Sequence, residues 1–121
     1  AAYVDIAVHG DGKITSMQFR RSQGGITEQI EAANATPQVL QITKTGDRYV
    51  VAVADHGGML SSDGADPQHP MDVQLELGEQ ILVGIFVCSH KADTIERAIF
   101  ENVELKLNPV GLPIQTQEAT R

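Results

Sequence analysis

The chain has 121 residues, which is the size of one domain and enough to bury a hydrophobic core. Its 16 acidic residues against 9 basic ones give a formal net charge of −7, which argues against nucleic acid and an anionic membrane surface as partners. The single cysteine, Cys88, excludes an intrachain disulfide, and no apolar run reaches the roughly 20 residues of a membrane span. We therefore expect a neutral or cationic ligand, or another protein, as the partner.

The first half of the chain has the pattern of an all-β protein. Short alternations of apolar and polar residues are separated by turns rich in Gly and Asp. Gly10-Asp11-Gly12 and Thr45-Gly46-Asp47 each predict the turn of a hairpin. The strands expected on this basis lie at residues 3–9, 13–21, 26–32, 39–44 and 48–54.

The second half mixes one irregular stretch with further strand patterns. Residues 55–71 are interrupted by Gly and Pro and predict a long surface loop, with a short strand around Met59-Leu60. Alternation then predicts a strand at 72–77, and the apolar runs QILVGIFVCSH and RAIFENVELKL predict two closing strands at 80–90 and 97–107. Cys88, inside the first of these runs, is expected to be a buried core residue.

Several of these segments resemble a known family. YVDIAVHGDGKITSMQFRRSQGG, LQITKTGDRYVVAVA, the strand ending in Ser-His at 83–90 and the Ala-x-Phe-x-Asn-Val at 98–103 are similar to a concanavalin A-like (laminin G-like) jelly-roll domain. The version in question is found beside TolB-like β-propellers in bacterial proteins. The resemblance spans about residues 3–107.

The resemblance implies an antiparallel β-sandwich over residues 1–107, followed by a linker or tail at 108–121. Family members carry further strands before the one at residue 3, so the sandwich is expected to be incomplete on its N-terminal side. The family also implies a carbohydrate-associated, extracytoplasmic protein, periplasmic or secreted, that is often non-catalytic.

Polar residues on the second and third expected strands form the candidate ligand-binding surface. Gln18, Arg20 and Glu28, with Gln29 beside them, supply the donors and acceptors that sugar hydroxyls require. His90 ends the expected strand at 80–90 and is added as a hydrogen-bonding candidate. The alternative is an ordinary solvated face of an antiparallel sheet, which has the same composition.

The long loop is the candidate metal site. Asp55, Asp63 and Asp66 lie within it, and laminin G-like domains often bind calcium at a rim loop. The spacing matches no EF-hand, and Asp beside Gly is also common turn chemistry. The four histidines show no zinc-binding spacing.

No catalytic signature is present in the sequence. The Glu-x-Asp-x-x-Glu of retaining β-glucanases is missing, and Glu28 and Glu31, three apart, are expected on opposite faces of a strand. We therefore expect a non-catalytic module, carbohydrate-binding or assembly-forming, that acts beside another domain, a protein partner or further copies of itself. Two alternatives stay open: a glycoside-processing enzyme like the 3-keto-glycoside hydrolases, and a purely structural subunit whose open edges pair with a partner.

Overall fold

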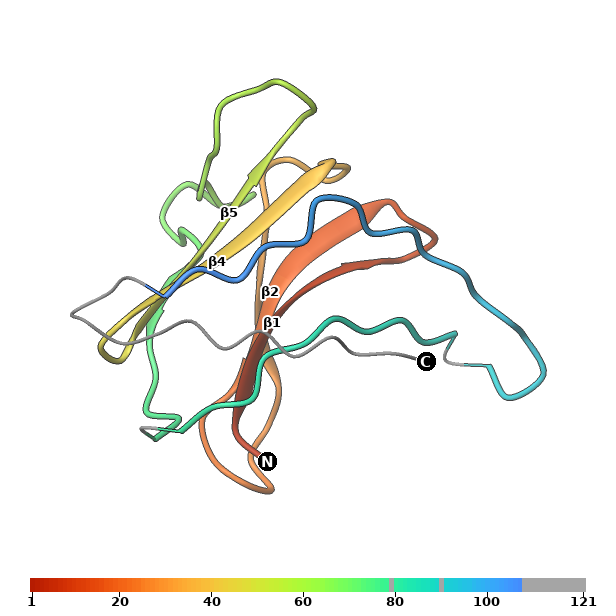
Figure 1. The fold of residues 1–121 in the computed structure, drawn as a ribbon. Helices are drawn as coiled ribbons and strands as arrows, with labels where there is room; N and C mark the ends of the chain where they lie inside the picture. The colour runs from red at the N-terminus through yellow and green to blue at the C-terminus, as the bar shows by residue number, and fades with distance from the viewer. Residues whose placement is uncertain (79, 90, 108–121) are drawn as a thin grey trace. The chain divides into compact units, whose positions relative to one another are not determined.

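The computed structural model describes residues 1–78, 80–89 and 91–107, and within these ranges it is all-β with no helix. The chain divides into two compact units, Ala1–Ile81 and Leu82–Arg121. Six antiparallel strands, all in the first unit, form two three-stranded sheets (Figure 1). Their bounds are β1 Tyr3–His9, β2 Ile14–Arg20, β3 Glu28–Glu31, β4 Val39–Thr45, β5 Arg48–Ala54 and β6 Asp72–Gln74. The all-β prediction is confirmed, and the expected domain at 1–107 spans both units.

The first sheet has the order β1-β2-β3. Its first hairpin pairs Tyr3 with Arg20 at one end and His9 with Ile14 at the other. The connecting turn needs left-handed backbone at three successive residues, and Asp11 between two glycines adopts it with a φ of 59°. This turn fixes which residues of β1 and β2 share a face.

The second sheet has the order β4-β5-β6. A two-residue turn joins β4 to β5, and Gly46 at its first position has a φ of 59°, as a type II′ hairpin requires. β6 is much shorter than the expected strand at 72–77 and pairs with the first half of β5.

One hydrophobic cluster draws its buried side chains from both sheets. β2 contributes Met17 and Phe19, and β5 contributes Tyr49, Val51 and Val53. All of these are almost completely buried, because alternate residues of each strand point to the same side. Ala32, Met71, Val73 and Leu75 complete the buried cluster.

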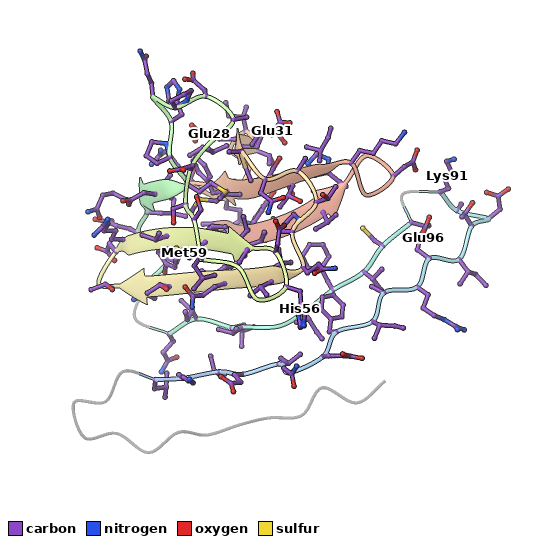
Figure 2. All side chains as sticks on the ribbon, turned by 90° about the horizontal axis from the view of Figure 1, so that it is seen from above. Glu28, Glu31, His56, Met59, Lys91 and Glu96 are labelled. Carbon is purple, nitrogen blue, oxygen red and sulfur yellow. The ribbon has the colours of Figure 1, made fainter. Side chains whose placement is uncertain are left out.

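The loop at residues 55–71 is more ordered than the sequence indicates. No strand forms at Met59-Leu60; instead Ser61 bridges to Val53 and Gly64 bridges to Ala32. The loop carries His56 and the exposed Met59 at its surface (Figure 2). It therefore hydrogen-bonds to β5 of the second sheet and, on either side of Ala32, to Glu31 and Ala33.

Residues 80–89 and 97–107 depart from the expectation. No strand is assigned in either of these described ranges, although their sequences alternate as strands do. Cys88 is exposed, so the prediction that it is a core residue is wrong. The physical reason is that this segment belongs to neither sheet, and an apolar run becomes a buried strand only through pairing. The expected tail at 108–121 lies outside the described residues.

Candidate functional site

The side of the first sheet opposite the hydrophobic cluster carries a group of polar side chains that the strand register brings together. Asp5 pairs across the strands with Gln18, and Gln18 pairs with Gln29 on β3. Directly paired residues share one face of a sheet, so these three side chains form a row. We call the following set the polar face: Tyr3, Asp5, Gln18, Arg20, Thr27 and Gln29.

Hydrogen bonds organise one end of the polar face. The Tyr3 hydroxyl lies 3.1 Å from the Thr27 hydroxyl, and the Arg20 guanidinium donates to the same Thr27 oxygen at 3.2 Å. The Arg20 guanidinium carbon also lies 5.4 Å from the centre of the Tyr3 ring, within cation–π range. These contacts hold the Arg20 side chain across the sheet surface.

Two buried polar atoms on this face have no hydrogen-bond partner among the described residues. They are Asp5 Oδ1 and Arg20 Nε. Burial raises the pKa of Asp5 above its usual value, and the charge of His9 opposes this rise. A buried polar atom without a partner costs about 1–3 kcal/mol, so a group that reached these two atoms and hydrogen-bonded to them would stabilise this face.

Glu28 does not belong to the polar face, and this corrects the expectation that it shares a face with Gln18 and Arg20. The register pairs Glu28 with Phe19, whose side chain is in the core, and pairs Glu31 with Ser16. The two glutamates of β3 therefore lie on opposite faces, as their spacing predicts (Figure 2). Glu28 accepts a hydrogen bond from Arg21 at 2.9 Å on its own side of the sheet.

A cavity of about 500 Å³ extends from β3 to the long loop. Gln29 of the polar face lines it, as does Glu31 from the same side of the sheet. From the loop come Ala65, Asp66 and His69, of which Asp66 accepts a hydrogen bond from the backbone N–H of Gln68 at 3.0 Å. The structure thus brings the polar strand surface and the Asp/His loop together at one place.

The three loop aspartates do not converge. Asp55 accepts a hydrogen bond from Asn34 at 2.9 Å, while Asp66 lies 2.8 Å from the ring nitrogen Nδ1 of His69. The backbone carbonyl of Asp63 accepts from Ala33, and its backbone N–H donates to the Ser61 hydroxyl. Within residues 1–78, 80–89 and 91–107, no group of three or more His, Cys, Asp or Glu is placed to hold a metal ion. Calcium binding at this loop stays a prediction.

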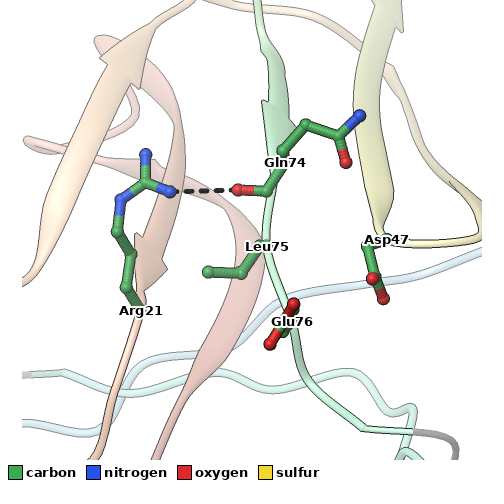
Figure 3. A pocket seen from close by; sticks show the side chains of 5 residues that line it. All are labelled: Arg21, Asp47, Gln74, Leu75 and Glu76. Carbon is green, nitrogen blue, oxygen red and sulfur yellow. Dashed lines mark hydrogen bonds between the residues drawn. The ribbon is translucent and has the colours of Figure 1, made fainter.

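A smaller cavity of about 340 Å³ lies where the two sheets meet (Figure 3). Arg21 projects into it and donates to the backbone carbonyl of Gln74 at 3.0 Å, while its Nε donates to Glu28. Asp47 and Glu76 are the acidic residues in its lining. Because the protein already engages the Arg21 guanidinium twice, this cavity is a weaker ligand candidate than the polar face.

Sequence reasoning identified three members of the polar face, Gln18, Arg20 and Gln29, and missed the other three. Tyr3 and Asp5 enter through the register, and Thr27 enters through its hydrogen bonds with Tyr3 and Arg20. A signal for Asp5 exists, because it alternates with Tyr3 along the first expected strand. The remaining candidate, His90, lies outside the described residues.

Comparison of the chain with protein-family models, curated proteins and solved structures gives no match. In the described ranges no helix has the length and apolar character needed to cross a membrane.

Proposed function

We propose that this chain is a non-catalytic β-sandwich module that binds a carbohydrate on the polar face. The observation that carries the proposal is the pair of buried, unpartnered atoms Asp5 Oδ1 and Arg20 Nε on one sheet surface. A sugar hydroxyl both donates and accepts, so adjacent hydroxyls of one ring can satisfy a carboxylate and a guanidinium together. Gln18 and Gln29, paired with Asp5 in one row, add amide groups with the same double capacity.

The charge of the protein favours a neutral ligand over an anionic one. The formal net charge is −7, and Arg20 is the only basic member of the polar face. A polyanion needs several basic contacts to offset its charge. A neutral polysaccharide is bound mainly through hydrogen bonds, and Asp5, Gln18 and Gln29 of the polar face can supply them.

The placement of carboxylates favours binding over hydrolysis. Asp5 and Glu31 share the sheet face but lie on the two outer strands, with β2 between them. Their backbones are separated by two inter-strand spacings of about 4.8 Å each. The register also displaces the two residues along the strand direction, because Asp5 pairs with Gln18 and Glu31 pairs with Ser16. A retaining glycosidase holds its two carboxyl groups about 5–5.5 Å apart, and an inverting one about 6.5–9.5 Å apart. The wider separation of Asp5 and Glu31 therefore supports a non-catalytic module over the glycoside-processing alternative.

The proposal is tested by retention of the folded chain on immobilised neutral polysaccharides, first with calcium and then with chelator. We expect retention by one glycan class and its loss in Arg20→Ala and in Gln18→Ala. Glu28→Ala is the matched control, because Glu28 is on the same sheet but on its opposite face. Loss of retention with chelator would assign calcium to the loop that borders the polar face.

Two results would contradict the proposal. One is the absence of retention on every glycan by protein whose melting temperature shows it to be folded. The other is an equal loss of retention in Arg20→Ala and Glu28→Ala, because a binding surface confined to the polar face cannot respond to both. Either result would leave a structural, assembly-forming role as the better account.

The protonation of Asp5 gives a second test that needs no ligand. Its pKa is raised from 3.8 by burial, so the folded chain holds this proton more tightly than the unfolded chain. The resulting stability is complete below pH 3.8 and is lost as the pH rises through the raised pKa. Asp5→Asn should therefore raise the melting temperature at pH 7 and change it little at pH 3. A lower melting temperature at pH 7 would mean that the carboxylate is already satisfied.

A further inference from the structure

We propose that β4 is a self-pairing edge, which adds to β4 of a second copy of this chain to form one continuous six-stranded sheet. The pairing is antiparallel, about a two-fold axis that passes beside Ile42. This inference is independent of the ligand proposal, because it concerns the second sheet and the polar face belongs to the first.

β4 is the least protected of the four sheet edges. Proteins guard exposed edges with charges, prolines, bulges or very short strands. β1 carries Asp5, β3 carries Glu28 and Glu31, and β6 has only three residues, one of them acidic. β4 has seven residues with no acid, no proline and one lysine, and its register with β5 runs without a bulge.

Apolar side chains of β4 are exposed on the side of the sheet that forms the core. Leu40 and Ile42 are 38% and 44% exposed, yet their direct partners on β5, Val53 and Val51, are 2% and 0% exposed. All seven residues of β4 are exposed. Among the described residues, the core side of the second sheet is therefore covered at β5 and exposed at β4, where a further strand would extend the buried surface.

The backbone of β4 is also oriented for a partner. Val51 and Val53 direct their N–H groups away from β4, to the carbonyls of Met71 and Ser61. Their partners on β4, Leu40 and Ile42, therefore occupy non-hydrogen-bonded positions of the β4–β5 ladder. Lys44, two residues after Ile42, occupies a position of the same kind. The N–H and C=O groups of these residues point outward from the sheet edge.

A two-fold axis at Ile42 matches these outward groups. Ile42 faces Ile42 of the second copy in a hydrogen-bonded pair, and Leu40 of each copy faces Lys44 of the other. The two lysines therefore oppose leucines, and like charges do not meet. Because the axis is perpendicular to the sheet, the exposed leucines and isoleucines of both copies lie on the same side.

Sedimentation velocity over a concentration series tests the proposal. A pair of seven-residue strands is small beside the roughly 1,600 Å² of a stable complex, so the dimer fraction is expected to rise with concentration. Ile42→Lys places two like charges directly opposite each other and should abolish the dimer. Gln74→Lys is the matched control, because it adds the same charge to β6, another edge of the same sheet, and should leave the dimer unchanged.

A backbone variant keeps the test valid if Ile42→Lys fails to fold. The N–H of Ile42 points away from β5, so Ile42→Pro removes a donor needed by the second copy and none that bonds to β5. We expect a folded monomer from Ile42→Pro. Thr43→Pro removes an N–H that bonds to β5, and it should lower the melting temperature instead.

Amide hydrogen exchange supplies a residue-level readout. The amides of Leu40, Ile42 and Lys44 should exchange quickly in dilute protein and slowly in concentrated protein, while Gln41 and Thr43 stay protected in both. A monomer at every concentration would overturn the proposal. So would a dimer that Ile42→Lys and Ile42→Pro leave intact, since association would then use another surface, such as the exposed apolar residues 81–87.

Discussion

The loop at residues 55–71 and the apolar segment at 80–89 differ in backbone pairing, and the difference is the opposite of what their sequences suggest. The loop is polar, irregular and interrupted by Gly and Pro, yet it bridges to β5 and to Ala32, and its Met71 is completely buried. The segment is almost entirely apolar, yet no strand is assigned in it, and Leu82 is fully exposed. The availability of backbone hydrogen-bond partners explains this difference in order better than the pattern of apolar and polar side chains does.

Backbone hydrogen bonds show how the loop is held. Ser61 and Val53 exchange both of their hydrogen bonds, at 2.8 and 2.9 Å, and the Ala65 N–H donates to the carbonyl of Glu31 at 2.8 Å. The Met71 N–H donates to Ser62, which closes the loop on itself. Buried backbone groups must be paired, and the loop meets this requirement without regular secondary structure.

The largest effect is expected from glycine substitutions that contrast the two regions. A Cβ at Gly64 would lie 2.0 Å from the backbone carbonyl oxygen of His69, whereas a Cβ at Gly84 would meet nothing within 4 Å. Gly64→Ala should lower the free energy of unfolding by about 3 kcal/mol, because the obstacle is a backbone carbonyl that cannot rotate away as a side chain can. Gly84→Ala should change it by less than about 0.5 kcal/mol. Urea unfolding of both variants measures the difference, and equal effects would contradict the close packing of the loop.

Two methionines within the loop give the next effect. Met71 is fully buried and Met59 is 92% exposed. Met71→Ala should cost about 3 kcal/mol of stability, inside the range for buried methionines, and Met59→Ala should cost almost nothing. Thermal and urea unfolding measure both. A large loss in Met59→Ala would show that this side chain is covered in solution.

Hydrogen exchange compares the backbones directly. In dilute protein, the amides of Ser61, Ala65 and Met71 should exchange far more slowly than the amides at 82–87, because the former donate to fixed carbonyls. Mass spectrometry of peptides from the two regions checks this. Slow exchange across 82–87 would mean that this segment forms a strand in solution, and would restore the expectation from its sequence.

The smallest effect is expected from the protonation of Asp66 in the loop. The backbone N–H of Gln68 and the ring of His69 lower the pKa of Asp66 from 3.8. The associated stability is present above pH 3.8 and is lost as the pH falls through the lowered pKa. Asp66→Ala should lower the melting temperature slightly at pH 7 and not at pH 2. Asp66→Asn keeps an oxygen acceptor for Gln68, so a loss as large as that of Asp66→Ala would assign the effect to His69 instead.

Local pattern was sufficient where turn and strand signals agreed. The strands at 3–9 and 48–54 form with the expected bounds, because a glycine-containing hairpin turn adjoins each alternating run. It was insufficient where order depends on distant partners. Nothing near Gly64 in the sequence indicates that Ala32 will pair with it, and the apolar run at 80–90 cannot specify its own partner strand.

The candidate site shows the same dependence on register. Gln18 and Arg20 were identified because alternation along one strand places them on one face. Glu28 and Gln29 were both expected on that surface, but neighbouring residues of a strand point to opposite faces, and only the pairing register decides which of the two faces Gln18. The contacts of Thr27 with Tyr3 and Arg20 depend on the loop between β2 and β3, whose path the sequence does not reveal.

The placement of the two tyrosines gives this protein its own optical reporters. The chain has no tryptophan, so its near-ultraviolet emission comes from Tyr3 and Tyr49. Tyr49 is 2% exposed, and burial together with the charge of Asp47 raises the pKa of its hydroxyl. Tyr3 lies beside Arg20 on the polar face. Quenching by an added solute should therefore separate the two signals, one reporting the integrity of the interior and the other the occupancy of the surface, without any introduced label.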